Sequence, residues 1–122
     1  MKRNIGLKIL IAILIVITLT TNSLAQTRIK FARGKSSATL SGSLSSGDTR
    51  SYVLTMRRRQ IITISVTSGN KKVEIMLEDD GGALGSEYGY LRMETSSNGD
   101  HWIILQNDGS RTTKYTMTVS VR

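Results

Sequence analysis

The sequence predicts an all-β protein: an antiparallel β-sandwich of about seven to eight short strands after an N-terminal signal peptide. Three observations lead to this fold class. Apolar and polar residues alternate with a period of two beyond residue 25, and no stretch there has apolar residues at helical spacing. The 11 glycines are enough to supply turns between strands. The chain has no cysteine, so packing alone must stabilise the domain.

The N-terminal segment has the parts of a signal peptide. Basic residues precede an apolar run from Ile9 to Leu19, and Ser23-Leu24-Ala25 supplies small residues where a signal peptidase reads the chain. Crossing a bilayer takes about 20 apolar residues, more than this run contains. We therefore expect cleavage after Ala25, with an uncleaved anchor as the alternative. Residues 1–25 are then the signal peptide and residues 26–122 the β-sandwich domain.

Each predicted strand is bounded by turn residues, as at Gly34, Ser45–Asp48 and Ser68–Asn70. In chain order the strands are Arg28–Phe31, Ala38–Ser43, Ser51–Met56, Ile61–Thr67, Val73–Leu77, His101–Gln106 and Lys114–Val121. The side chains expected to face the core are Ile29, Phe31, Ala38, Leu40, Tyr52, Leu54, Met56, Ile62, Ile64, Val66, Val73, Ile75, Leu77, Tyr115, Met117, Val119 and Val121.

The pattern also indicates which strands are neighbours and where it weakens. We expect Ile61–Thr67 to pair with Val73–Leu77, and the last two strands to pair across the turn Asn107–Ser110. The segment 83–97 is the least regular, with a short candidate strand at Tyr90–Met93. Long connections in compact domains are often functional or mobile.

Charge is unevenly distributed after the predicted cleavage point. Residues 26–72 carry ten Lys or Arg against one acid, a net +9, whereas residues 73–122 carry four against eight, a net −4. The predicted domain therefore has a net charge of +5, which favours anionic partners outside the cytoplasm such as cell-wall polymers or an acidic protein surface. Nucleic acid is a poor candidate partner in that compartment.

Several segments together resemble a known family. They are Ile29–Ala38, Ser41-Gly42, Tyr52, Gln60, Asn98–Asp100 and Lys114–Val119. The chain looks like the pre-peptidase C-terminal type of β-sandwich, in the branch that contains bacterial goose-type lysozyme inhibitors. The resemblance covers nearly all of residues 26–122, but most matched residues are turn glycines and inward apolar positions, which specify a fold more than a function.

The resemblance also implies a binding site. In the inhibitors, loops at one end of the sandwich, including a basic loop before the last strand, enter the lysozyme cleft. The corresponding segment here is Asn107–Thr113, which is shorter and carries Arg111. The chain departs from the family pattern at Trp102, often a tyrosine, and at Arg59-Gln60, where glycine precedes the glutamine. If that turn needs a positive φ, arginine costs about 1 kcal/mol relative to glycine.

No residue set predicts catalysis or metal binding. His101 is the only histidine, and a partly exposed strand position is expected for it. A Ser-His-Asp triad would also need an exposed nucleophile, and no Gly-x-Ser-x-Gly turn is present to hold one. The acidic run Glu78–Gly81 lacks the spaced ligands of a calcium loop, so it is interpreted as a turn. No enzyme activity, metal or cofactor is expected.

Two groups of exposed residues are candidates for partner binding. Arg57, Arg58 and Arg59 are adjacent, and guanidinium groups bind phosphate or carboxylate bidentately. With Lys71-Lys72 on a neighbouring turn they would form one basic end of the sandwich, or they are a solvated turn. The aromatic candidates are Tyr88, Tyr90 and Trp102, because aromatic rings serve as interface anchors and as stacking platforms for sugars. Trp102 fits the core equally well.

The leading functional prediction is an exported, non-enzymatic binding domain, periplasmic or secreted, that resembles goose-type lysozyme inhibitors. Such a domain would block a muramidase by inserting loop residues into its cleft, with Arg111, Tyr88 and Tyr90 as the candidates. One alternative is a carbohydrate-binding or cell-surface adhesion module. Another is a structural envelope protein without a defined ligand. No stable membrane span is expected after cleavage.

Overall fold

The computed structural model describes residues 26–122, and the predicted signal peptide, residues 1–25, lies outside this part. Nine strands account for the regular structure of the described part, and none of its residues is helical. They are β1 (Thr27–Arg28), β2 (Ser37–Leu44), β3 (Thr49–Met56), β4 (Ile61–Ser68), β5 (Val73–Asp79), β6 (Gly82–Tyr88), β7 (Tyr90–Glu94), β8 (Gly99–Asn107) and β9 (Thr113–Val121). The all-β prediction is confirmed. Within residues 26–122 there is also no helix long and apolar enough to span a membrane.

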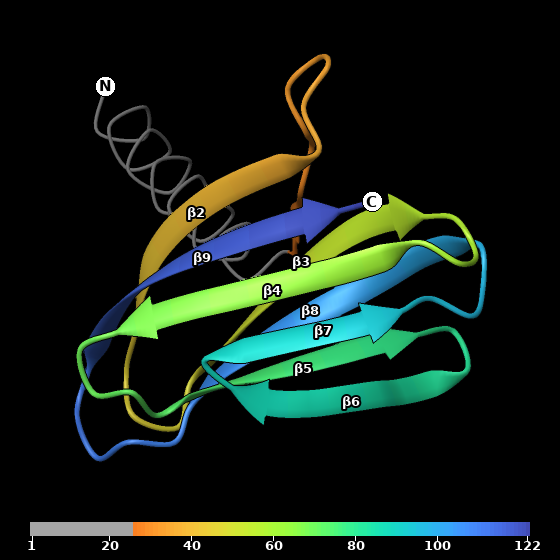
Figure 1. Ribbon diagram of the computed structural model, residues 1–122. Coiled ribbons are helices and arrows are strands. Elements are labelled where there is room, and N and C mark those ends of the chain that lie inside the picture. Colours follow the sequence, from red (N-terminus) through yellow and green to blue (C-terminus); the bar gives the residue numbers. More distant parts are fainter. Residues whose placement is uncertain (1–25) are drawn as a thin grey trace, which may run out of the picture.

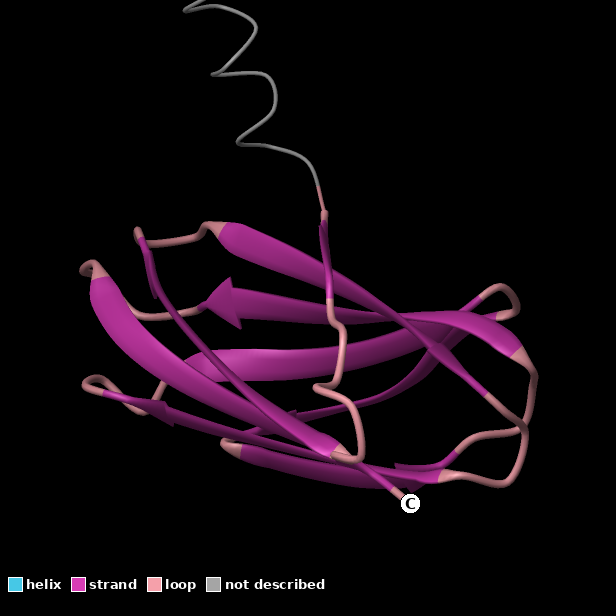
Figure 2. Ribbon diagram, turned by 90° about the horizontal axis from the view of Figure 1, so that it is seen from above, coloured by secondary structure: helices cyan, strands magenta, loops and turns pink. Residues whose placement is uncertain are grey.

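The strands form two layers. Sheet A has the order β1-β3-β8-β5-β6 and sheet B has the order β2-β9-β4-β7 (Figure 1). All neighbours are antiparallel except β1, which pairs parallel to β3 through Thr27 and Arg28. Figure 2 shows the two layers from above, with most loops at the two ends of the sandwich and the connection from β1 to β2 crossing its middle. The predicted antiparallel β-sandwich is therefore the observed architecture.

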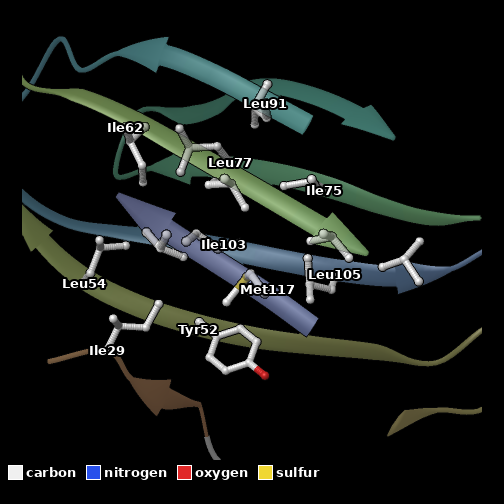
Figure 3. Close-up of a cluster of buried hydrophobic side chains, with 14 of the residues drawn as sticks. Ile29, Tyr52, Leu54, Ile62, Ile75, Leu77, Leu91, Ile103, Leu105 and Met117 are labelled. Atoms are coloured by element: carbon white, nitrogen blue, oxygen red, sulfur yellow. The ribbon is translucent and has the colours of Figure 1, made fainter. Parts of the chain in front are cut away.

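The core lies between the two sheets and contains the alternate residues of each strand. Sheet A contributes Tyr52, Leu54, Ile75, Leu77, Ile103 and Leu105, and sheet B contributes Ile62, Leu91 and Met117 (Figure 3). Ile64 of sheet B is also fully buried in this core. The hydroxyl groups of Tyr52 and Tyr115 lie 2.6 Å apart and join the two layers. Gly42 is required beside them, because a Cβ atom there would lie 2.5 Å from the Tyr115 hydroxyl oxygen. Shape and hydrogen bonding thus fix how the layers face each other.

The predicted pairing of consecutive strands was wrong in two places. β4 and β5 belong to different sheets, and so do β8 and β9. The segments 69–72 and 108–112 therefore cross from one layer to the other instead of closing hairpins. Among the described strands only β5 and β6 are both consecutive and paired. Alternation along a strand sets which face is buried, but it does not say which sheet the strand joins.

The first and the least regular predicted segments also differ from expectation. β1 is shorter than the predicted strand Arg28–Phe31, although the N–H of Ile29 still donates to Val53 O at 2.8 Å. Residues 82–97 contain two strands, β6 and β7, instead of the single candidate Tyr90–Met93. β6 is an edge strand with mostly exposed residues. Such a strand carries little apolar alternation, so the sequence gives little sign of it.

Candidate functional site

The loops that connect β2 through β9 lie at two opposite ends of the sandwich, which we name by one arginine each. The Arg111 end comprises residues 45–48, 69–72, Gly89 and 108–112. The Arg58 end comprises residues 57–60, 80–81 and 95–98. Strands β4 and β9 run the whole distance between them (Figure 1). The partner-binding candidates therefore divide between two separate surfaces.

Asn107, predicted only as a turn residue, organises the Arg111 end. Its side chain is fully buried, and its Nδ2 donates to Leu44 O at 3.0 Å and to Arg111 O at 2.8 Å. Its Oδ1 accepts from Asn70 Nδ2 and from the N–H of Gly109, both at 2.9 Å. One side chain therefore connects the ends of β2 and β4 to the segment that carries Arg111.

Two further contacts hold the same loop. Ser46 Oγ donates to Gly109 O at 2.6 Å. A Cβ atom on Gly109 would collide with the side-chain amide of Asn70, so a larger residue there would displace this amide from its hydrogen bond to Asn107. With the backbone held at positions 107, 109 and 111, the loop has few alternative conformations. The Arg111 side chain projects from it into solvent.

The exposed side chains next to this loop are Tyr88 and Lys72. Tyr88 is 55% exposed, and its hydroxyl donates to Asp108 Oδ2. This hydrogen bond to a carboxylate raises the pKa of Tyr88, because the ionised phenol would lose the donated bond and repel the acid. The N–H of Asp108 in turn donates to Lys72 O at 2.9 Å. Tyr88 is thereby fixed beside the Arg111 loop.

A cavity of about 320 Å³ opens between the sheets at the Arg111 end. Val66 of β4 and Val73 of β5 line it, and Tyr88 and Lys71 also contribute to its wall. In residues 26–122 the only ion pair joins Arg28 and Asp100, so Arg111 and Lys71 both have free charges. The Arg111 end thus combines cationic groups, an exposed ring and an apolar hollow, which suits an acidic partner with projecting side chains.

Tyr90 does not belong to this site. It lies opposite Ser65 in the β4–β7 register, whereas its neighbour Leu91 lies opposite Ile64 and is buried. Because side chains alternate between faces along a strand, Tyr90 lies on the outer face of sheet B. Tyr88 lies opposite Glu74 on sheet A. The structure therefore brings Arg111 and Tyr88 to one end and places Tyr90 on another surface.

At the Arg58 end, Arg57, Arg58 and Arg59 form the turn between β3 and β4 and are all exposed. Arg59 has a φ of 67°, so the turn does need the left-handed conformation in which glycine is favoured. The backbone N–H of Arg57 donates to Gln60 Oε1 at 2.6 Å, and that of Arg58 donates to Asn98 Oδ1 at 2.8 Å. The turn is well held and presents three cations to solvent.

The predicted union of this cluster with Lys71 and Lys72 does not form. The arginines precede β4 and the two lysines follow it. An eight-residue strand spans about 25 Å at roughly 3.3 Å per residue, and β4 has eight residues. Arg57–Arg59 and the lysines are therefore at opposite ends of the sandwich.

His101 is fully buried, which corrects the expected partly exposed position. Its Nδ1 lies 3.0 Å from Gly99 O, and its Nε2 has no hydrogen-bond partner. The neighbouring Asp100 points to the opposite face, where its carboxylate pairs with Arg28 at 2.9 Å, and this pairing lowers the pKa of Asp100. The histidine and the acid therefore cannot act together in a triad.

Trp102 and the acidic turn have structural contacts of their own. Trp102 is half-buried on the outer face of sheet A, and its Nε1 donates to Gln26 Oε1 at 3.2 Å. Asp79 accepts hydrogen bonds from the N–H of Gly81 at 2.8 Å and from Ser97 Oγ at 2.9 Å. Within the described residues no three acidic, His or Cys side chains gather into a metal-binding group.

Comparison with known proteins shows the fold. No protein-family model and no curated protein sequence matches the chain. Among solved structures, the chain is similar to PliG of Aeromonas hydrophila, a periplasmic inhibitor of g-type lysozyme, with a TM-score of 0.73 and 22% identity over 80% of this chain and 96% of that one. PliG of Salmonella Typhimurium, also a periplasmic inhibitor of g-type lysozyme, gives 0.68 and 17% identity, covering 80% and 97%.

A third similar structure is the pre-peptidase C-terminal domain of a Bacillus anthracis collagenase, with a TM-score of 0.60 and 18% identity over 80% of this chain and 95% of that domain. These identities are low, so the similarity concerns the fold. The resemblance predicted from the sequence is confirmed at that level: the chain has the β-sandwich fold shared by the PliG inhibitors and the pre-peptidase C-terminal domain.

Proposed function

We propose that this chain is an exported, non-enzymatic inhibitor of a goose-type lysozyme, acting in the periplasm or after secretion. The observation that supports this most directly is the Arg111 loop, which is held by the buried Asn107 and projects a free guanidinium beside Tyr88. The similar PliG structures are inhibitors of g-type lysozyme. The predicted signal peptide, residues 1–25, supports the location.

The proposed mechanism is occlusion of the enzyme cleft without any reaction. Glycoside hydrolases position carboxyl groups beside the scissile bond, so their clefts are anionic. Arg111 would enter such a cleft and pair with a carboxylate, because guanidinium and carboxylate groups form two parallel hydrogen bonds. The ring of Tyr88 would pack against the cleft wall. Substrate and inhibitor would then compete for one site.

Pre-organisation explains how such a short loop could bind the enzyme cleft. A flexible loop loses conformational freedom when it binds, at about 0.5 to 1.5 kcal/mol for each immobilised side chain. Here the backbone of the loop is already fixed by Asn107, Asn70 and Ser46. The net charge of +5 on residues 26–122 would in addition attract an anionic cleft over a distance.

The test measures goose-type lysozyme turnover on cell walls in the presence of the purified protein. We expect inhibition, and we expect Arg111→Ala to weaken it at least about thirtyfold, because truncating one partner of a buried charge pair costs about 2 to 5 kcal/mol. Arg58→Ala is the matched control, since it removes the same charge at the opposite end.

Both variants lose one positive charge, so the long-range attraction to the enzyme changes equally in both. They differ only in which end of the sandwich loses its arginine. An unchanged inhibition constant for Arg58→Ala supports the assignment to the Arg111 end. Absence of inhibition at a large molar excess of the wild-type protein rules out the proposed function. Equal losses for the two variants would show that net charge, and not the Arg111 loop, is responsible.

A further inference from the structure

The outer face of sheet B carries an array of hydroxyl groups. On β2, β9 and β4 the outward positions are occupied almost entirely by serine and threonine. The strand register aligns nine of them in three rows of three, which are Ser37–Ser120–Thr63, Thr39–Thr118–Ser65 and Ser41–Thr116–Thr67. We call these nine residues the hydroxyl grid.

The grid is regular in both directions. Neighbouring strands lie about 4.8 Å apart, and alternate residues along a strand lie about 6.7 Å apart. Hydroxyl groups of adjacent strands are in contact: Thr39 Oγ1 and Thr118 Oγ1 are 3.3 Å apart, and Ser41 Oγ and Thr116 Oγ1 are 3.4 Å apart. Threonine side chains have restricted χ1 rotation. The hydroxyl groups are therefore ordered before any partner arrives.

The chemistry of the grid selects an uncharged partner. None of its nine residues carries a charge; cations lie at its margins, where Arg92 is opposite Thr63 and Lys114 is opposite Ser43. A charged group placed directly over the nine hydroxyl groups would lose hydration without gaining an ion pair there, which is unfavourable. A hydroxyl group both donates and accepts hydrogen bonds, so the grid is complementary to another surface of hydroxyl or amide groups. Neutral polysaccharides have this composition.

The margins of the grid add two features that a polysaccharide requires. Tyr90 extends the row Thr39–Thr118–Ser65 and is 53% exposed. An exposed ring of this kind serves as a stacking platform for the apolar face of a sugar. Two shallow hollows lie at opposite ends of the face. One, of about 350 Å³, is lined by Thr63, Ser120 and Tyr90 together with Arg92 and Arg122. The other, of about 400 Å³, is lined by Ser41, Thr67 and Thr116 together with Lys114.

We propose that the hydroxyl grid and Tyr90 together form a binding surface for an extended, uncharged polysaccharide chain. The chain lies across the strands, a sugar ring stacks on Tyr90, and the hydroxyl rows bond to its neighbours. Each hydroxyl contact replaces a contact with water, so its net contribution is small, about 0.5 to 1.5 kcal/mol. Binding to one chain is consequently weak, and retention on a polymer surface comes from several grid contacts acting together. The hydroxyl grid and Tyr90 include neither Arg111 nor Tyr88, so the surface can be tested separately from the Arg111 loop.

The experiment measures retention of the purified protein on two insoluble uncharged polymers, cellulose and chitin. We expect retention on at least one of them. The double variant Thr39→Val/Thr118→Val removes two central hydroxyl groups with little change of shape, and valine favours strands, so the fold is maintained. It should reduce retention at least fivefold, and Tyr90→Ala should do the same. Thr49→Val/Thr112→Val is the matched control, with two exposed threonines outside the grid, and should bind as the wild type does.

The salt concentration distinguishes retention through the hydroxyl grid from retention through the charged ends of the molecule. At about 1 M salt the Debye length falls to about 3 Å, which screens exposed charges. Retention through the grid should persist at that salt concentration. Retention that disappears there, or that survives both the double valine variant and Tyr90→Ala, overturns the proposal.

Two further outcomes are decisive. Absence of retention on both polymers overturns the proposal, whether or not the protein inhibits lysozyme. Sedimentation velocity gives the oligomeric state, and a dimer that the same valine substitutions dissociate would show that the grid binds a second copy of this chain. Should the double variant unfold, Ser65→Ala and Tyr90→Ala test the same surface separately.

Discussion

Replacing Asn107 with alanine tests the structural basis of the candidate site. The substitution removes two donated and two accepted hydrogen bonds. Two of the abandoned groups, Leu44 O and the N–H of Gly109, belong to buried residues, and a buried unsatisfied group costs about 1 to 3 kcal/mol. Asn70 and Arg111 O can be rehydrated and add less. We expect the free energy of unfolding to fall by about 3 kcal/mol.

Urea unfolding followed by circular dichroism gives this free energy by linear extrapolation. Asn98→Ala is the control, because Asn98 is exposed and accepts a single hydrogen bond, from the N–H of Arg58. It should cost about 0.5 to 1 kcal/mol. If Asn107→Ala costs no more than Asn98→Ala, the buried network does not hold the Arg111 loop, and the argument from pre-organisation fails with it.

Two further substitutions test individual features. Arg59→Gly should stabilise the protein by about 1 kcal/mol and raise its melting temperature, because Arg59 has a φ of 67°. Arg58→Gly is the control at a position without a positive φ and should lower the melting temperature. If both variants shift the melting temperature in the same direction, the backbone at Arg59 is not strained. Burial and the hydrogen bond to Tyr52 raise the pKa of Tyr115. The folded state therefore holds this proton more tightly than the unfolded chain. The contribution of Tyr115 to the free energy of unfolding is fully present below about pH 10, and above that pH it decreases by about 1.4 kcal/mol per pH unit. Urea midpoints at pH 9 and pH 11 should show a smaller alkaline loss for Tyr115→Phe, and an equal loss would contradict the assignment.

The core could be predicted from the sequence because burial in a strand follows a strict period of two. Ile62, Ile64 and Val66 were expected to face inward, and all three are buried. The same rule would have placed His101 and Asn107 correctly, since both lie an even number of residues from the buried Ile103 and therefore face the same side of β8. Both residues were instead interpreted from their chemical type. Polar type is a weaker guide than position in an alternating strand.

Strand partners and site composition could not be obtained in this way. The segment after Asn107 has the composition of a hairpin turn, yet Asn107 is buried and the chain crosses to the other sheet. Whether Arg57–Arg59 meets Lys71 depends on which end of β4 each occupies, and whether Tyr90 joins Tyr88 depends on which sheet each strand enters. The serines and threonines of the hydroxyl grid alternate visibly in the sequence, but only the register of β2, β9 and β4 assembles them.

The position of β9 has a consequence for how the chain matures. The last strand lies between β2 and β4, so sheet B cannot close until the final residues have been synthesised. Contacts between residues so distant in sequence also make folding slow. A chain in which β9 is not yet made would accordingly stay open, and the proposed export through a translocation pore requires such an open chain. Removing β9 would leave β2 without a partner strand and separate it from β4 and β7, so a chain truncated before Thr113 should be degraded instead of accumulating as a folded domain.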